Sequence, residues 1–314
     1  MNKQGILKIL KEKTCNNNLK FPTSIDIESN DGILQITLSE SGLKDNMQED
    51  KSAFEGWAIV IKAIAPDHAK QVKILWRGIG LGKGNDYNHY RRFLYRIIKF
   101  KESYEWAEGN PLDDQAKHDM ENVYSEINQK KWVTNYPDSN SKEDAAKGEA
   151  RLERNLIECL RKISEYANHQ LPVGLFYKDK CVKNERTPHK CSQIDLWSIK
   201  GDTITVYELK KDDNRKVGII SELMFYTNII KDLSTKIISF ASGAEKTNYR
   251  NFSALHNIIT SANCNIEGVF LTNDLHTLIK LGGANIFALL NGNNRDIKYK
   301  QMGYKISDIY EVES

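Results

Sequence analysis

Two acidic residues and one lysine in the second half of the sequence are of the types that a catalytic site uses. Residues 203–210 alternate like a strand, which places Glu208 and Lys210 on the same face of it. Asp195 lies in the preceding predicted strand, and the short polar turn between the two segments is typical of a hairpin. Such a hairpin would bring the Asp195 carboxylate opposite that of Glu208.

These side chains suit the chemistry of a divalent cation. Two carboxylates that converge from neighbouring strands repel each other unless a cation lies between them. Oxygen ligands of this kind bind Mg²⁺ or Mn²⁺, and the backbone carbonyl of Leu209 offers a further oxygen. Lys210 cannot bind a metal, because its ammonium has donors and no acceptor. We expect it instead to hold or activate a water molecule, or to stabilise the charge on a phosphate group.

The same residues give the sequence a resemblance to the PD-(D/E)XK nuclease superfamily, whose fold is called restriction-endonuclease-like. The core motif of that superfamily is an Asp on one strand followed by an acid-x-Lys triplet on the next. It is matched here by Asp195 and by Glu208-Leu209-Lys210, with an isoleucine in the place of the proline. The resemblance covers roughly residues 145–290 and implies an α/β core with a central mixed sheet flanked by helices.

Two further elements of the superfamily have counterparts in this sequence. A glutamate on the helix that precedes the strands is matched by Glu153 or, less closely, by Glu149. The resemblance implies that this glutamate helps to bind the metal, either directly or through a water. Several exonuclease branches carry a Gln-x-x-x-Tyr motif on the following helix, where this chain has Glu222 and Tyr226. Those two residues would then lie against nucleic acid.

The resemblance therefore implies a metal-dependent nuclease that hydrolyses phosphodiester bonds, with Mg²⁺ or Mn²⁺ as cofactor and DNA rather than RNA as substrate. Its catalytic residues would be Glu153, Asp195, Glu208 and Lys210. The alternative is a catalytically inactive scaffold on the same fold, which binds nucleic acid or protein. Taken by themselves, Glu208 and Lys210 also match a solvated ion pair on an edge strand.

One strongly basic segment stands out in the first half of the sequence, between Lys83 and Lys101. Within it, Arg92, Arg96 and Lys99 are spaced four and three residues apart, which places them on one face of a predicted helix. Basic side chains interleaved with aromatic ones suit a phosphate backbone and unstacked bases. We therefore expect this face to bind nucleic acid, and an ordinary solvated helix face is the alternative.

Two other motifs carry less information. The glycine-rich segment 78–84 lacks the Gly-Lys-Ser/Thr ending of a phosphate-binding loop, so we interpret it as a plain loop. Cys181, His189 and Cys191 lack the fourth ligand and the paired spacing that a zinc site needs. We assign neither motif a function.

The chain is expected to fold as two regions, because turn-forming and polar residues at 136–142 separate two patterned stretches. Residues 1–140 are predicted to be an α+β region for nucleic-acid recognition or assembly, and residues 141–314 a nuclease-like α/β domain. Hydrophobic periodicity predicts helices and strands within both. The predicted helices are 90–106, 143–169 and 216–233, and the predicted strands are 33–38, 57–65, 72–76, 175–177, 193–199, 203–210, 266–271 and 284–289.

Composition narrows the class of protein. The 314 residues are 40% hydrophobic and 28% charged, as in ordinary globular chains, and a net charge of +3 is too small to indicate a nucleic-acid partner by itself. The longest mostly apolar run extends only from Trp57 to Ala65, whereas a membrane-spanning helix needs about 20 residues. Five cysteines and no secretory signal predict a cytoplasmic protein without a disulfide framework. No membrane partner is expected, and a homodimer is compatible with these features.

Overall fold

The structure is a computed structural model of the chain, and it describes residues 1–137, 149–177, 192–211, 216–261, 264–305 and 308–312. The fold is mixed α/β, as predicted, and it divides into two compact units. The first unit comprises Met1–Ser125, Arg215–Glu222 and Leu275–Arg295, and the second comprises Glu126–Asn214, Leu223–Asp274 and Asp296–Ser314. Each unit is therefore assembled from separate stretches of the sequence. The predicted boundary at 136–142 extends into residues 138–148, which lie outside the described residues.

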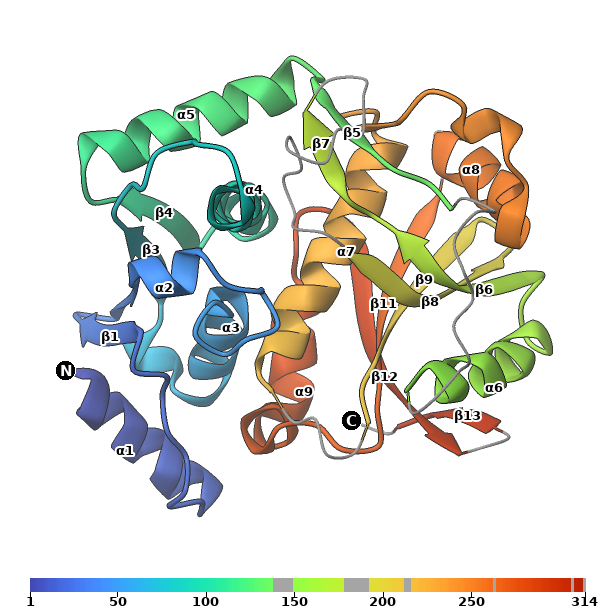
Figure 1. Cartoon of the computed structure of the whole chain (residues 1–314). Coiled ribbons are helices and arrows are strands. Elements are labelled where there is room, and N and C mark those ends of the chain that lie inside the picture. Colours follow the sequence, from blue (N-terminus) through green and yellow to red (C-terminus); the bar gives the residue numbers. More distant parts are fainter. Residues whose placement is uncertain (138–148, 178–191, 212–215, 262–263, 306–307, 313–314) are drawn as a thin grey trace. The chain divides into compact units, whose positions relative to one another are not determined.

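The first unit is built on a four-stranded sheet in the order β1-β2-β3-β4 (Figure 1, blue to green). β2, β3 and β4 are parallel, and β1 pairs with β2 antiparallel. The β1–β2 turn contains Asp31 and Gly32, both with positive φ, as tight hairpin turns require. The elements here are α1 (Lys3–Thr14), β1 (Ile25–Asn30), β2 (Ile33–Leu38), α2 (Glu40–Leu43), α3 (Phe54–Ile64), β3 (Gln71–Trp76), α4 (Asn85–Ser103), β4 (Ala107–Pro111), α5 (Asp114–Asn128) and α9 (Thr277–Asn291).

The second unit contains a six-stranded mixed sheet in the order β13-β12-β11-β9-β8-β6 and a smaller sheet in the order β10-β5-β7 (Figure 1). In the larger sheet, β6, β8 and β9 form an antiparallel meander, and β11 returns parallel to β9. The elements here are β5 (Trp132–Thr134), α6 (Glu149–Arg161), β6 (Tyr166–Pro172), β7 (Leu175–Tyr177), β8 (Gln193–Lys200), β9 (Thr203–Leu209), α7 (Gly218–Ser234), β10 (Ser239–Phe240), the single turns η3 (Ala244–Lys246) and η4 (Tyr249–Asn251), α8 (Phe252–Thr260), β11 (Asn265–Leu271), β12 (Ile297–Lys305) and β13 (Asp308–Glu311).

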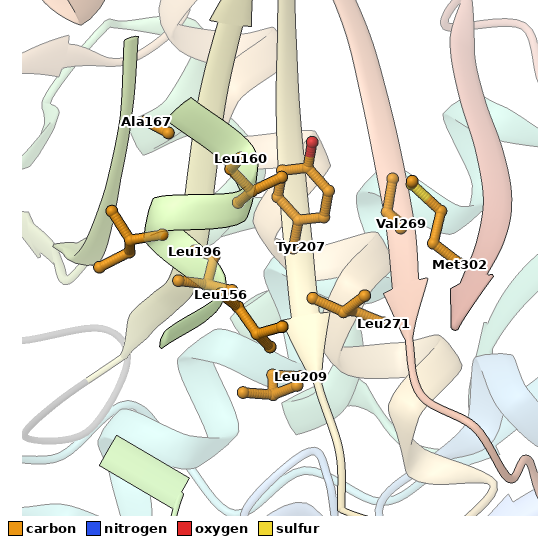
Figure 2. Close-up of a cluster of buried hydrophobic side chains, with 10 residues drawn as sticks. Leu156, Leu160, Ala167, Leu196, Tyr207, Leu209, Val269, Leu271 and Met302 are labelled. Atoms are coloured by element: carbon orange, nitrogen blue, oxygen red, sulfur yellow. The ribbon is translucent and has the colours of Figure 1, made fainter. Parts of the chain in front are cut away.

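Helix α6 covers one face of the six-stranded sheet. Its residues Leu156 and Leu160 pack in one buried cluster with Leu196 of β8 and with Tyr207 and Leu209 of β9 (Figure 2). The apolar residues of α6 recur at steps of three and four, so they form a single stripe facing the sheet. Burying each such leucine contributes roughly 1.5–3 kcal/mol, and this packing decides which face of the two strands is apolar.

Most predicted elements of both units are found. Helices occur at α4 and α7, where periodicity predicted 90–106 and 216–233. Strands occur at every predicted strand segment except two. The hairpin turn between β8 and β9 is also confirmed, with Gly201 at φ 59 and the pair Lys200–Thr203 closing it.

The two exceptions are helical, and they have physical reasons. Residues 57–64 of the first segment belong to α3, in which every residue from Phe54 to Ile61 is buried. A segment that is apolar on all sides carries no period that separates a strand from a helix. Residues 284–289 belong to α9, whose conformation is interrupted at Gly283. Neither helix is a membrane candidate: no helix among the described residues is long and apolar enough to cross a bilayer.

The predicted helix 143–169 is too long. Residues 143–148 lie outside the described residues, α6 ends at Arg161, and strand β6 begins at Tyr166. Ile163 continued the helical spacing in the sequence, yet it is 50% exposed. The helical spacing of apolar residues therefore continues by coincidence through the loop after α6 and into β6, which is an edge strand of the larger sheet.

Helix α9 begins with a histidine cap. The Nδ1 atom of His276 accepts a hydrogen bond from the backbone N–H of Leu278 at 3.2 Å, and the His276 ring meets the Trp57 ring edge-on at 6.5 Å. Burial lowers the pKa of His276 to about 4. The ring must be neutral at this site, because a protonated Nδ1 has no lone pair with which to cap the helix.

We expect stability to fall as the pH drops from about 6.5 towards about 4, because in that window the unfolded chain binds a proton at His276 that the folded chain does not. The loss from this group should be about 2–3 kcal/mol. His276→Asn keeps a capping oxygen and removes the titration. Chemical unfolding of both proteins at pH 7, 5.5 and 4 should show a smaller pH dependence for the variant, and equal dependence would contradict the prediction.

Candidate functional site

The β8–β9 hairpin brings the predicted acidic pair together. The two strands are antiparallel, and the last paired residues are Leu196 and Tyr207. Asp195 and Glu208 are the next residues on each strand, so they lie on neighbouring strands at the same level of the sheet. The Asp195 Oδ2 atom accepts a hydrogen bond from the backbone N–H of Leu209 at 2.9 Å, which ties the two strand ends together.

The pleat determines the direction of these side chains. Leu196, Tyr207 and Leu209 belong to the cluster that packs beneath α6 (Figure 2). Because alternate residues of a strand point to opposite faces, Asp195 and Glu208 point to the face that α6 does not cover. The α6 packing therefore fixes the register that puts both acidic side chains on one face.

Lys210 forms an ion pair with Glu208 in the interior. The ammonium donates to Glu208 Oε1, and the two residues are 8% and 1% exposed. Their strand lies between β8 and β11 and is not an edge. A solvated edge-strand ion pair, the simpler interpretation of these two residues, is therefore wrong. Burying a charged pair is costly unless its geometry and surroundings compensate, so the pair is not an incidental surface feature.

Two groups that hold the Lys210 backbone were missed by sequence reasoning. The Lys210 N–H donates to the carbonyl oxygen of Leu271 at 3.1 Å, and the Tyr304 hydroxyl donates to the Lys210 carbonyl at 3.3 Å. Leu271 ends a predicted strand, and parallel pairing of that strand with β9 was the signal available. Tyr304 belongs to β12, which the sequence pattern did not indicate.

Glu153 is buried but faces a different strand. Its Oε2 atom accepts from the Gln170 side chain at 3.3 Å and lies 3.7 Å from Nδ1 of His169, both on β6. Within the part of the chain that the structure describes, no three His, Cys, Asp or Glu side chains are grouped so that they could hold a metal. The structure thus brings Asp195 and Glu208 together but does not add Glu153 to them as a third ligand. The side chain of Glu149 lies outside the described residues.

Glu222 and Tyr226 lie one turn apart on α7, as their spacing requires. They are 6% and 4% exposed, and the Tyr226 ring packs against that of Phe225 with 5.7 Å between centroids. Their assignment to nucleic-acid binding stays a prediction.

The expectation of an exposed basic face on α4 is wrong. Arg92, Arg96 and Lys99 are between 2% and 3% exposed. Arg96 forms an ion pair with Glu55 of α3, and Lys99 pairs with Glu102 at 2.9 Å. Arg92 donates to the backbone carbonyl of Asp45 at 3.1 Å and lies 2.6 Å from the Nδ1 atom of His89. These charges are therefore used inside the first unit and do not form a solvent-exposed surface.

The glycine-rich segment 78–84 is a loop, as the sequence predicted, and two of its backbone N–H groups donate hydrogen bonds to carboxylates. The N–H of Gly78 donates to Asp113 at 3.0 Å and that of Gly80 to Asp119 at 3.1 Å. Amides that already bind carboxylates are not available to cradle a phosphate. The Cys181, His189 and Cys191 group lies outside the described residues.

Comparison with known proteins finds no relative of this chain: no family model matches the sequence, and no match is found among curated proteins or solved structures.

Proposed function

We propose that the second unit is a metal-dependent nuclease that hydrolyses phosphodiester bonds of nucleic acid, DNA rather than RNA. The observation that carries this proposal is the β8–β9 hairpin end, where Asp195 and Glu208 share one face and Lys210 forms a buried ion pair with Glu208. The order of α6, β6, β8, β9, α7 and β11 supports it, because the PD-(D/E)XK motif needs an Asp strand followed directly by an acid-x-Lys strand.

The donor set fits Mg²⁺ or Mn²⁺. Two carboxylates and the backbone carbonyl of Leu209 are hard oxygen ligands, and the buried charge of Glu208 already attracts a cation, the Lys210 ammonium. Asp195, Glu208 and Leu209 would hold the metal. When bound, it would supply Lewis-acid stabilisation of a phosphate and activation of a water.

The protein groups have separate tasks in this proposal. Asp195 binds the Leu209 N–H, so the end of β9 is held still where positioning matters. Lys210 carries a positive charge in a site with little solvent, where it stabilises negative charge that develops on a phosphate oxygen or an attacking water. Leu271 and Tyr304 anchor the backbone of Lys210, which limits the movement of that charge.

A second candidate function is a scaffold on the same fold that binds nucleic acid without cutting it. The observation that favours it is the position of Glu153, which contacts β6 and, among the described residues, does not join Asp195 and Glu208 in a metal-holding group of three. Two carboxylates bind a divalent cation less strongly than three.

The test is an assay of the purified chain on labelled single- and double-stranded DNA and RNA, with Mg²⁺, with Mn²⁺ or with EDTA. We expect shorter DNA products with either metal and none with EDTA. Electrophoretic binding to the same panel separates the two candidates. Binding without cleavage in every metal condition would reject the nuclease and support the scaffold, and neither binding nor cleavage would reject both.

A further inference from the structure

A cavity of about 410 Å³ lies beside β6, the edge strand of the six-stranded sheet. Its polar and charged lining consists of Arg154, Glu158 and Arg161 of α6, Asn168 and His169 of β6, and Arg250 of η4. The volume is in the range of small-ligand sites, about 300–1,000 Å³, but such sites are mostly apolar. Three guanidinium groups against one carboxylate make this cavity suited to an anion instead.

The two arginines of α6 come from one side of the helix. Arg154 and Arg161 are seven residues apart, which is close to two turns, so they project in the same direction. Arg161 pairs with Glu158 at 2.7 Å, and both side chains are largely exposed. An exposed pair of this kind contributes little to stability, so an incoming anion can replace Glu158 at small cost.

Arg250 lines the cavity from a turn with an unusual backbone. Arg250 and Asn251 are consecutive residues with φ of 56° and 59°, a conformation that residues with a side chain rarely adopt. The Nη1 atom of Arg250 donates to the carbonyl oxygen of His169 at 3.2 Å, and the guanidinium lies over the Tyr249 ring at 5.1 Å. The strained turn thus fixes a guanidinium against β6.

Buried polar residues of β6 line this cavity. Asn168 and His169 are 6% and 9% exposed, and the His169 ring lies 3.7 Å from Glu153. His169 pairs across the sheet with Leu196, which packs under α6, so the His169 side chain lies on the α6 face. Both α6 and η4 contact β6, and Figure 1 shows α6 and α8, the helix that follows η4, flanking that strand.

We propose that this arginine cavity binds a backbone phosphate of a nucleic-acid strand, an inference that rests on the proposed function. Arginine forks match the oxygens of a phosphate in pairs, which is why arginine is favoured in phosphate recognition.

The test is binding of a fluorescent single-stranded oligonucleotide by the full chain in EDTA, followed by anisotropy over a series of salt concentrations. We expect the double variant Arg154→Gln/Arg161→Gln to bind at least tenfold more weakly than the wild type. The slope of log affinity against log salt should fall by about 0.7, the contribution of one single-strand phosphate. Arg151→Gln is the matched control, because Arg151 is an exposed arginine of the same helix that does not line the cavity.

The outcomes separate this inference from the proposed function, since EDTA prevents metal-dependent cleavage. A double variant that binds like Arg151→Gln, with a normal circular dichroism spectrum, would overturn the inference. So would a wild-type chain that binds inorganic phosphate, measured by calorimetry, but no oligonucleotide, because the cavity would then be a free-phosphate site. Arginine-dependent binding by a chain that never cleaves with Mn²⁺ would support the inference and reject only the nuclease.

Discussion

Lys210→Met is expected to lower nucleic-acid cleavage by about 10²- to 10³-fold while Mn²⁺ binds at least as tightly as in the wild type. The size of the effect follows from removing one preorganised charge from a site with little solvent. The direction of the metal effect follows from the ion pair with Glu208. Once the ammonium is gone, a cation no longer competes with it for the carboxylate.

The Lys210→Met substitution should also make the stability of the fold depend on whether Mn²⁺ is bound. Removing one partner of a buried ion pair leaves the other charge uncompensated, which costs about 3–5 kcal/mol, and Glu208 is 1% exposed. A metal bound at Glu208 would offset that cost. We therefore expect Mn²⁺ to raise the melting temperature of Lys210→Met more than that of the wild type. A metal that binds only the folded protein raises its stability, and the effect grows with the affinity of the metal.

Calorimetry with Mn²⁺, a cleavage assay and thermal unfolding check these expectations together. Asp195→Asn should differ from Lys210→Met by losing metal binding and cleavage alike. Lys200→Met is the control for the loss of a lysine, because Lys200 is exposed at the other end of the hairpin. Cleavage by Lys210→Met at the wild-type rate would show that the lysine has no catalytic role.

The hairpin could be predicted from sequence because everything that determines it is local. Alternation along 203–210 and a glycine turn set the strands, and the register of an antiparallel hairpin follows from its turn. Asp195 lies opposite Glu208 as a consequence of that register. Contacts with Leu271 and Tyr304 depend on strands far along the chain, and no local pattern encodes them.

The position of Glu153 and the arginine cavity could not be predicted for a related reason. Glu153 contacts Gln170 on β6, and Gln170 has a positive φ of 49°, which local propensity does not indicate for glutamine. Arg250 reaches the α6 arginines only because η4 folds back onto β6. Such sites are assembled from segments whose proximity is decided by the topology of the sheet.

The basic helix failed as a prediction because its partner was misassigned. Glu55 lies at the start of α3, and an apolar strand was predicted directly after it. With α3 as a helix, Glu55 is placed to meet Arg96 of α4. A charged residue on a predicted helix is usually solvated, and here the buried carboxylate reverses that expectation.

Arg96 is joined to Glu55 in an interior network within the first unit. Arg96 Nε donates to Glu55 Oε1 at 2.8 Å, and Arg96 Nη2 donates both to Glu55 Oε2 and to the Ser52 carbonyl. The Ser221 hydroxyl donates to Glu55 Oε2 at 2.8 Å, and the guanidinium lies 4.7 Å from the centre of the Phe54 ring. The two side chains are 2% and 3% exposed, so water cannot replace a lost partner.

We expect Arg96→Met to lower the free energy of unfolding by about 3–5 kcal/mol, because it removes one partner of a buried ion pair. Glu55→Leu should cost a similar amount by leaving Arg96 uncompensated. The double variant should recover most of the loss, since an apolar pair of similar volume removes both buried charges. Denaturant unfolding gives the three free energies, and hydrogen exchange of peptides from α3 and α4 locates the loss in the first unit. Additive losses in the double variant would show that the two residues do not act as a pair, because a coupled pair must deviate from additivity.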